Sequence, residues 1–257
     1  IKTVTSNQWI LEDSDIIFKE VKFNAGIYKI FDEIITNASD ECQRNNDVKT
    51  IKVSIKDDTI SVMNDGTGIP IVIHKEHNIY VPELIFGNML SSSNYDDSEK
   101  RTTGGLNGLG AKLTNIYSKE FTIETVSKGQ KYIQTFRDNM SIIEKPKITK
   151  STGKEYTKIS FIPDFSKFGL KKLDQYDNID ILKKRVFDIS AITNKRVSIH
   201  FNDSKINCKD FSDYISYYIG PKSKSPRVYY ENDNWEIGVA LSSNDCFQQV
   251  SFVNGIS

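Results

Sequence analysis

The sequence of 257 residues predicts an α+β fold, because helix-like and strand-like patterns occupy separate stretches of the chain. Residues 25–44 carry apolar side chains at helical spacing. Residues 50–63 alternate apolar and polar side chains around a turn, and residues 120–162 contain further strand-like segments. Each pattern leaves one apolar face to bury, so we expect a long helix packed on a sheet.

The first half of the chain is predicted to contain a long helix, a hairpin and two shorter helices. The apolar stripe of the helix at 25–44 consists of Ile27, Ile30, Phe31, Ile34, Ile35 and Ala38. Asp57 and Asp58 form the turn of the hairpin at 50–63. A helix is predicted at 81–90, and another follows the glycines near position 110 and ends near Tyr117.

The second half alternates between strands and helices up to a break in composition. Strands are expected at 120–127, 130–137, 155–162 and 197–201, and helices at 176–194 and 210–219. The run GPKSKSP at 220–226 is rich in Gly, Pro, Ser and Lys, as linkers are, and strand-like sequence follows it. We therefore expect one domain at 1–220 and the beginning of a second at 221–257.

The composition indicates an ordinary globular protein. Lys and Arg number 34, equal to Asp and Glu, so the net charge is zero and gives no sign of nucleic-acid binding. The three cysteines are scattered and form neither a zinc pattern nor a disulfide framework. The sequence contains no run of about 18 apolar residues and no signal peptide, so no membrane association is expected. Both ends interrupt patterned sequence, and we expect the chain to be a fragment of a longer protein.

The segment TTGGLNGLGAKLTN at 102–115 is the most informative of the chain. Glycines that precede a helix let backbone amides approach an anion closely, and phosphate is the usual anion at such loops. A flexible turn before a helix is the alternative. Neither common phosphate loop fits, because Ala111 follows the second glycine where a P-loop needs lysine, and the glycine spacing is not that of the dinucleotide fingerprint.

The helix at 25–44 also carries a polar stripe beside its apolar one. Glu33 and Asn37 are four residues apart and lie on one face of the helix. A solvated acidic edge is the simple interpretation. The functional interpretation makes Glu33 a general base for an attacking water and Asn37 an uncharged oxygen ligand of Mg²⁺.

The turn NDGTGIP at 64–70 is a third candidate part of a nucleotide site. Gly66 and Gly68 allow close approach of the backbone, and Asn64 offers a donor and an acceptor to a base edge. A plain Asp-Gly turn would explain the same letters. The order along the chain favours function: polar helix, hairpin, glycine turn, polar segment, glycine loop and helix.

Two further groups are given structural interpretations. His74 and His77 are three residues apart, but no cysteine or carboxylate pattern completes a ligand set, so a metal site there is disfavoured. The Lys/Arg run at 183–185 is expected on a solvated helix face.

Four segments together resemble the GHKL ATPases, whose ATP site uses the Bergerat fold, and more closely the ATPase region of eukaryotic-type DNA topoisomerase II. These segments are KIFDEIITNASDECQR (29–44), NDGTGIPIVIHK (64–75), residues 80–118 and QQVSFVNGIS (248–257). The resemblance implies a mixed, mostly antiparallel sheet layered with helices, ATP on the helical side, and the start of a transducer domain after position 220.

The resemblance also implies roles for individual residues. Glu33 matches the catalytic base, Asn37 the Mg²⁺ ligand and Asn64 the residue that faces the adenine amino group, with Gly68 in the same turn. Residues matching the phosphate- and ribose-binding lid and loop are Ser92, Ser93, Asn94, Gly105, Asn107, Gly108, Leu109, Gly110, Ala111 and Lys112. Leu106 also lies in this loop, where the family commonly has Arg, and Leu109 replaces a frequent Tyr.

By the same resemblance, binding and hydrolysis of Mg-ATP close the N-terminal gate of a homodimer that passes one double-stranded DNA through another. The location implied is the nucleus, or a cytoplasmic viral factory. The γ-phosphate-sensing lysine and the exchanged N-terminal strap of the family are expected outside this sequence. A histidine-kinase-type domain, a chaperone or mismatch-repair clamp, and a structural protein with incidental glycines are the alternatives.

Overall fold

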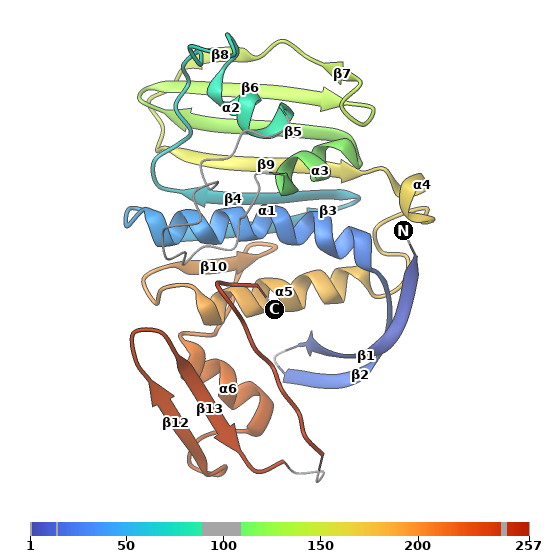
Figure 1. Cartoon of the computed structure of the whole chain (residues 1–257), viewed down its shortest axis with the longest axis vertical. Helices are drawn as coiled ribbons and strands as arrows, with labels where there is room; N and C mark the ends of the chain where they lie inside the picture. Colours follow the sequence, from blue (N-terminus) through green and yellow to red (C-terminus); the bar gives the residue numbers. More distant parts are fainter. Residues whose placement is uncertain (1, 14, 89–108, 243–245, 257) are drawn as a thin grey trace.

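The structure, a computed structural model, describes residues 2–13, 15–88, 109–242 and 246–256. Its centre is a sheet in which the order along the main path is β11-β10-β3-β4-β9-β5-β6-β7, with β8 paired to β6 (Figure 1). The bounds of these strands are β3 Thr50–Lys56, β4 Thr59–Asp65, β5 Ser118–Ser127, β6 Gln130–Arg137, β7 Ile142–Ile143, β8 Lys147–Lys150, β9 Tyr156–Pro163, β10 Ser198–Phe201 and β11 Ser204–Lys205. Among the pairings of the described strands only β10 with β3 is parallel, so the predicted mixed, mostly antiparallel sheet is confirmed.

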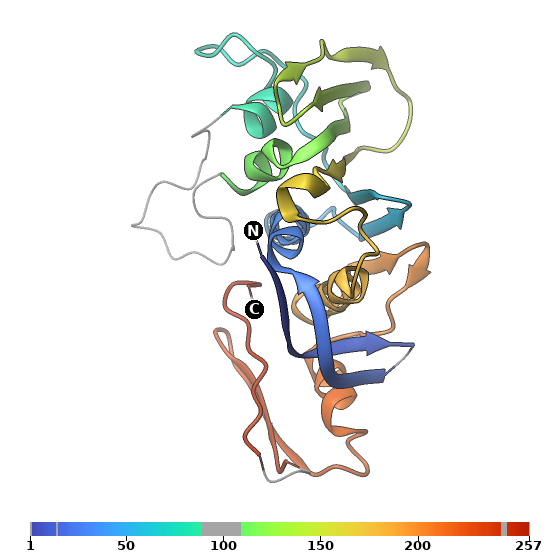
Figure 2. The same ribbon diagram turned by 90° about the vertical axis from the view of Figure 1, so that its right-hand side faces the viewer.

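Helices α1, α2, α3 and α5 lie over one face of this sheet, as the edge-on view in Figure 2 shows, and α6 lies beyond it. Their bounds are α1 Ala25–Arg44, α2 Val81–Gly87, α3 Gly110–Ile116, α4 Phe165–Phe168, α5 Asn178–Ile192 and α6 Phe211–Ile219. No helix among the described residues combines the length and apolar character needed to cross a bilayer.

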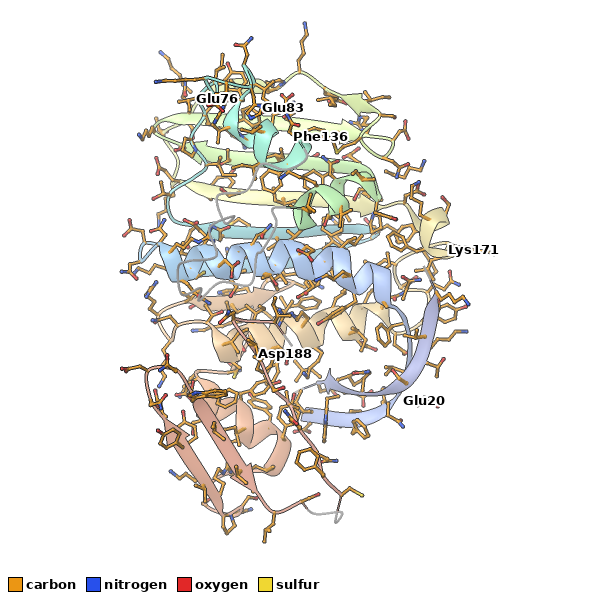
Figure 3. All side chains as sticks on the ribbon, viewed as in Figure 1. Glu20, Glu76, Glu83, Phe136, Lys171 and Asp188 are labelled. Carbon is orange, nitrogen blue, oxygen red and sulfur yellow. The ribbon has the colours of Figure 1, made fainter. Side chains whose placement is uncertain are left out.

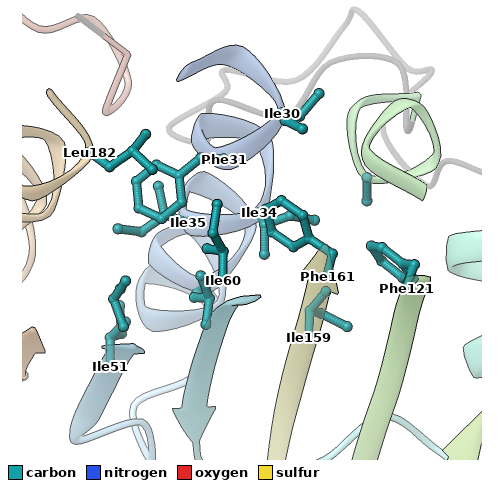
Figure 4. Close-up of a cluster of buried hydrophobic side chains, with 14 of the residues drawn as sticks. Ile30, Phe31, Ile34, Ile35, Ile51, Ile60, Phe121, Ile159, Phe161 and Leu182 are labelled. Carbon is teal, nitrogen blue, oxygen red and sulfur yellow. The ribbon is translucent and has the colours of Figure 1, made fainter. Parts of the chain in front are cut away.

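Helix α1 supplies the helical side of the main core. Phe31, Ile34 and Ile35 project from it toward the sheet and toward Leu182 of α5 (Figure 4). The sheet side of this contact is formed by buried residues of neighbouring strands, among them Ile51, Ile60, Phe121, Ile159 and Phe161. Each fully buried side chain of this kind contributes about 1.5–3 kcal/mol, so the apolar stripe fixes which face of α1 remains for other purposes.

Asn24 determines where α1 begins. Its side-chain oxygen accepts hydrogen bonds from the amides of Gly26 (2.9 Å) and Ile27 (3.2 Å), which is the usual N-cap arrangement. Its own amide donates to Asn178 Oδ1 at 2.8 Å, and its side-chain NH₂ donates to the carbonyl of Phe168 at 2.9 Å. One buried amide therefore aligns the first turns of α1 and α5.

Most elements predicted from periodicity are present with small shifts at their ends. The helix expected at 81–90 ends at Gly87, and the helix expected at 176–194 spans 178–192. The N-terminal hairpin of β1 (Thr3–Glu12) and β2 (Asp15–Asn24) was not predicted. Burial along β2 does not alternate strictly, so the period-two signal that identifies strands is weak there.

The expectation that the Lys/Arg run at 183–185 is solvated is wrong for two of its three residues. Lys184 is buried and donates to Asp188 Oδ1 at 2.6 Å. Arg185 is 1% exposed, and its Nε donates to Asp32 Oδ1 of α1 at 2.7 Å. Arg185 Nη2 donates to the carbonyl of Gly255 at 2.7 Å, so one guanidinium joins α1, α5 and the segment at 246–256.

Beyond position 220, β12 (Arg227–Glu231) and β13 (Glu236–Ala240) form a separate two-stranded sheet beside α6 (Figure 1). Apolar residues of this hairpin remain largely exposed, including Val228, Trp235 and Val239. The strand-like sequence predicted after the linker is thus present.

The Arg185–Asp32 pair is open to a direct test. The Arg185→Met variant keeps most of the side-chain volume but leaves the Asp32 carboxylate buried without its guanidinium. We expect the free energy of unfolding to fall by about 3–5 kcal/mol, measured by urea denaturation. The matched control Lys183→Met, on the same helix turn and only half-buried, should change it by no more than about 0.5 kcal/mol. Equal losses in the two variants would contradict the pairing.

Candidate functional site

The polar face of α1 presents the predicted base and metal ligand on the side away from the core. Glu33 is partly exposed, and Asn37, one turn further along, is exposed. Lys29, one turn earlier, forms an ion pair with Glu33, with 2.6 Å between Lys29 Nζ and Glu33 Oε1. Burial would lower the pKa of the Lys29 ammonium, but its hydrogen bond and attraction to Glu33 outweigh this, so its pKa is raised.

Helix α3 packs directly on α1. Thr114 Oγ1 donates to the carbonyl of Ile30 in α1 at 2.9 Å, and Thr114 is fully buried. Asn115 Nδ2 donates to the carbonyl of Phe86 at 3.1 Å, which joins α3 to α2. These two side chains set the position at which α3 begins, relative to the polar face of α1.

The first residue of α3 touches the carboxylate of Glu33. A Cβ atom added to Gly110 would lie 1.7 Å from Glu33 Oε2 and 2.3 Å from Glu33 Cδ. A side chain at position 110 would therefore have to displace the carboxylate of Glu33 from its place beside the helix start. Since the first amides of a helix have no intrahelical acceptor, this arrangement brings anion-binding donors and a carboxylate to one place.

Ala111 and Lys112 follow in the first turn of α3. Lys112 is 1% exposed, and burial lowers the pKa of its ammonium. The charged form of such a lysine is favoured by any anion placed beside it, which suits a residue expected to meet phosphate.

Asn64 occupies the end of β4, next to the turn at 64–70. It is 6% exposed, and its NH₂ donates to the carbonyl of Asp65 at 3.1 Å. Asp65 Oδ1 accepts from the amides of Lys49 and Thr50, each at 2.7 Å. The Asp65 carboxylate therefore secures the end of the hairpin and leaves Asn64 as the polar side chain to consider for recognition.

The two glycines of this turn are favoured for different structural reasons. Gly66 has φ of +98°, a conformation that side chains rarely adopt. Gly68 lies against the protein itself, because a Cβ there would be 1.9 Å from the carbonyl oxygen of Val126 in β5. The close approach predicted for Gly68 is thus made to a strand of the same chain.

Two threonines beside Asn64 were missed in the sequence. Thr157 of β9 is the register partner of Asn64, and Thr125 Oγ1 lies 3.2 Å from Thr157 Oγ1. Thr125 Oγ1 also accepts from the amide of Ile69 at 2.9 Å, which holds the glycine turn on the sheet. The two threonines are 32 residues apart, and both lie far from Asn64 along the chain, so no local sequence pattern connects the three.

The structure brings Glu33, Gly110 and the first turn of α3 together, with Asn37 on the same face of α1. Asn64 lies near the end of β4, in the sheet that α1 covers. Several predicted site residues lie outside the described part of the chain: Ser92, Ser93, Asn94, Gly105, Leu106, Asn107 and Gly108. Leu109 is described and directly precedes α3.

The part of the chain that carries these residues matches a known protein family. The sequence profile described as histidine kinase-, DNA gyrase B-, and HSP90-like ATPase matches residues 24–165, a range that contains Glu33, Asn37, Asn64 and Lys112. The chain therefore belongs to this family of ATPases. Family membership implies that the chain binds a nucleotide.

Within this family the chain is similar to topoisomerase II. It is 50% identical over 255 residues to a probable DNA topoisomerase 2 of Dictyostelium discoideum and 47% identical over 271 residues to the DNA topoisomerase 2 of Acanthamoeba polyphaga mimivirus. These alignments cover 96% and 100% of this chain, but only 17% and 21% of the relatives, so the chain spans about a fifth of their length.

Solved structures agree with the sequence relatives. The crystal structure of the ATPase region of Saccharomyces cerevisiae topoisomerase II has a TM-score of 0.92 and 43% identity, over 99% of this chain and 68% of that one. The resemblance to the ATPase region of eukaryotic-type topoisomerase II is confirmed, and with it the Bergerat-type α+β fold.

Because of the contact between Gly110 and Glu33, we expect an alanine at position 110 to destabilise the protein, although alanine has the higher helix propensity. Alanine normally stabilises a helix by about 1 kcal/mol relative to glycine. In Gly110→Ala the added methyl group must displace Glu33, so we expect a loss of about 1–3 kcal/mol in unfolding free energy. Chemical denaturation measures this loss, and calorimetry should show weaker nucleotide binding.

Gly153→Ala is the matched control, because the new Cβ would meet only Ser151 Oγ at an ordinary 3.5 Å. It should leave nucleotide affinity unchanged and alter unfolding free energy by no more than about 1 kcal/mol. Stabilisation by Gly110→Ala would contradict the contact.

Proposed function

We propose that this chain binds Mg-ATP between α1 and α3 and hydrolyses it, as the ATPase region of a type IIA DNA topoisomerase. The observation that carries the proposal is the placement of the Glu33 carboxylate against Gly110, at the first turn of α3. A general base and a set of backbone donors for phosphate then face the same space. Similarity to topoisomerase II ATPase regions supports the same conclusion.

In this proposal Glu33 accepts a proton from the water that attacks the terminal phosphate. A carboxylate must lie within hydrogen-bond reach of that water, and its contact with the start of the phosphate-binding helix provides the position. Lys29 holds the carboxylate through an exposed ion pair, which is weak enough to rearrange when other charges arrive. The amides of Gly110 and Ala111 and the ammonium of Lys112 stabilise phosphate charge.

Mg²⁺ fits the donors that α1 offers. The exposed amide of Asn37 presents a hard, uncharged oxygen one turn from Glu33, and Mg²⁺ commonly takes one or two protein oxygens and completes its shell with water and phosphate. When bound, the ion supplies charge neutralisation at the phosphates. Asn37 would hold it, and Glu33 remains available to the water.

Asn64 is proposed to face the adenine amino group, with Gly68 in the turn beside it. Thr125 accepts from the amide of Ile69 and lies within hydrogen-bond distance of Thr157, the strand neighbour of Asn64, so the glycine turn is tied to β5 and β9. We infer that the same hydroxyl pair positions the adenine end of the site.

The activity of the whole protein is also a proposal, because the chain corresponds to only a fifth of its relatives. By analogy with them, nucleotide binding would close a homodimeric gate for the passage of double-stranded DNA. The relatives come from eukaryotes and a virus, which supports a nuclear or viral-factory location. We place the boundary between the ATP-binding domain and a transducer domain near position 220.

Replacement of the base separates binding from turnover. In Glu33→Gln the shape is retained but proton acceptance is lost, so we expect nucleotide affinity near that of the parent and a fall in hydrolysis of at least about 100-fold. Affinity is measured on this chain by calorimetry, and hydrolysis on the full-length protein that contains it. Glu41→Gln, on the same helix, should hydrolyse ATP at the parent rate. A Glu33→Gln variant with parental turnover would exclude Glu33 as the base.

The loss of nucleotide affinity on replacing the proposed metal ligand should depend on magnesium. In Asn37→Ala the affinity for Mg-ATP should fall far more than the affinity for ATP in excess EDTA, because only the first contains the ion. Gln43→Ala removes another exposed amide from α1 and should change neither affinity. Equal losses for the two nucleotide forms in Asn37→Ala would refute the assignment.

A further inference from the structure

A second group of metal-binding side chains lies on the segment that leads into α2, where Figure 3 labels Glu76. His74, Glu76 and His77 each place one ligand atom within 4.8 Å of the others. Among the described residues no other such group of three is found. The sequence alone disfavoured a metal site here, and the structure adds the carboxylate of Glu76 beside the two histidines.

The backbone explains why these side chains meet. The amide of Asn78 donates to the carbonyl of His74 at 2.9 Å, which closes a single helical turn over residues 74–78. Residues three apart on such a turn share a face, and the rings of His74 and His77 have centroids 5.0 Å apart.

The turn is also fixed at both ends. The amide of His74 donates to the carbonyl of Ile79 at 2.8 Å, and Ile73 is bridged to Tyr80. Asn78 has φ of +54°, a conformation that asparagine tolerates better than most residues. A ligand set on a closed turn loses little conformational entropy when it binds, which favours a site over a chance cluster.

We propose that His74, Glu76 and His77 bind a divalent transition-metal ion of the Zn²⁺ class, at a surface site separate from the nucleotide site. Two imidazole nitrogens and one carboxylate oxygen form a common zinc ligand set, with water in the fourth position. The same nitrogen donors are poorly suited to Mg²⁺, which requires oxygen ligands. The two ion sites are therefore chemically distinct.

Only side-chain movement is needed to reach bonding distance. Tetrahedral ligands about 2.1 Å from zinc lie about 3.4 Å from one another, so no pair of ligand atoms must close by more than about 1.4 Å. His77 and Glu76 are exposed and free of packing constraints of the core. His74 Nδ1 accepts a long hydrogen bond of 3.3 Å from the amide of Glu76, and this contact can be exchanged for a metal bond.

A bound ion would cross-link the turn directly before α2. Val81 at the start of α2 donates its amide to the carbonyl of Val72, and Leu84 donates to that of Tyr80, so the turn and the helix share backbone hydrogen bonds. We expect binding to increase protection of amides 74–84 from hydrogen exchange.

Histidine NMR tests the site directly, because the chain has three histidines and the third, His200, lies in β10. The tag-free Cys246→Ser variant is used, since Cys246 is the exposed cysteine. The two buried thiols do not compete, because burial raises the pKa of Cys42 to about 12 and that of Cys208 to about 11. Stoichiometric Zn²⁺ should shift the imidazole resonances of His74 and His77 and leave His200 unchanged. Mg²⁺ should shift none of the three.

Variants in the same background complete the test. Residues that merely orient zinc ligands contribute about 10- to 100-fold to affinity, so His77→Asn and Glu76→Gln should each weaken Zn²⁺ binding by at least about tenfold in calorimetry. His200→Asn is the matched control and should bind as the parent does. Parental affinity in His77→Asn, or an equal loss in His200→Asn, would overturn the proposal. Circular dichroism confirms that each variant is folded, and affinity for Mg-ATP should be unchanged in all three.

Discussion

The packing of α1 on three sides is the constraint on which the site depends. Its apolar stripe is buried on the sheet, Thr114 of α3 bonds to its backbone, and Arg185 of α5 pairs with its Asp32. Only one face then remains available for chemistry, and Glu33 and Asn37 occupy it. The position of Glu33, the proposed base, is therefore determined by the core and by two neighbouring helices, which is how an enzyme keeps a reacting group in place at low entropic cost.

Two motif glycines of this chain lie in close contact with other parts of the protein. A Cβ at Gly68 would meet the backbone carbonyl of Val126, and a Cβ at Gly110 would meet the side-chain carboxylate of Glu33. Motif glycines are usually interpreted as room for a ligand, yet here the nearest neighbours of both positions belong to the protein itself. A substitution at either one would disturb the fold together with the site.

Features with a local signal could be predicted from the sequence. The stripe of α1, the hairpin of β3 and β4, and the glycine start of α3 follow from periodicity and turn chemistry, and Glu33 and Gly110 do meet. Arg185 resembled a solvated residue because its partner Asp32 is 153 residues away. Thr157 beside Asn64 depends on strand register, and the His74–Glu76–His77 group depends on one closed turn. Such pairings belong to tertiary structure, where one-dimensional patterns carry little information.

The buried ion pair has a consequence for how the protein is made. The segment that carries most of the nucleotide site is synthesised before α5 and β10, yet α1 needs Arg185, and β3 needs β10 along its outer edge. On a ribosome adding about 5–20 residues per second, the nascent chain spends seconds before Arg185 can meet Asp32, and the outer edge of β3 stays open for longer. The core around α1 is completed only when α5 and β10 have been made, and the open strand edge exposes the chain to aggregation in that interval.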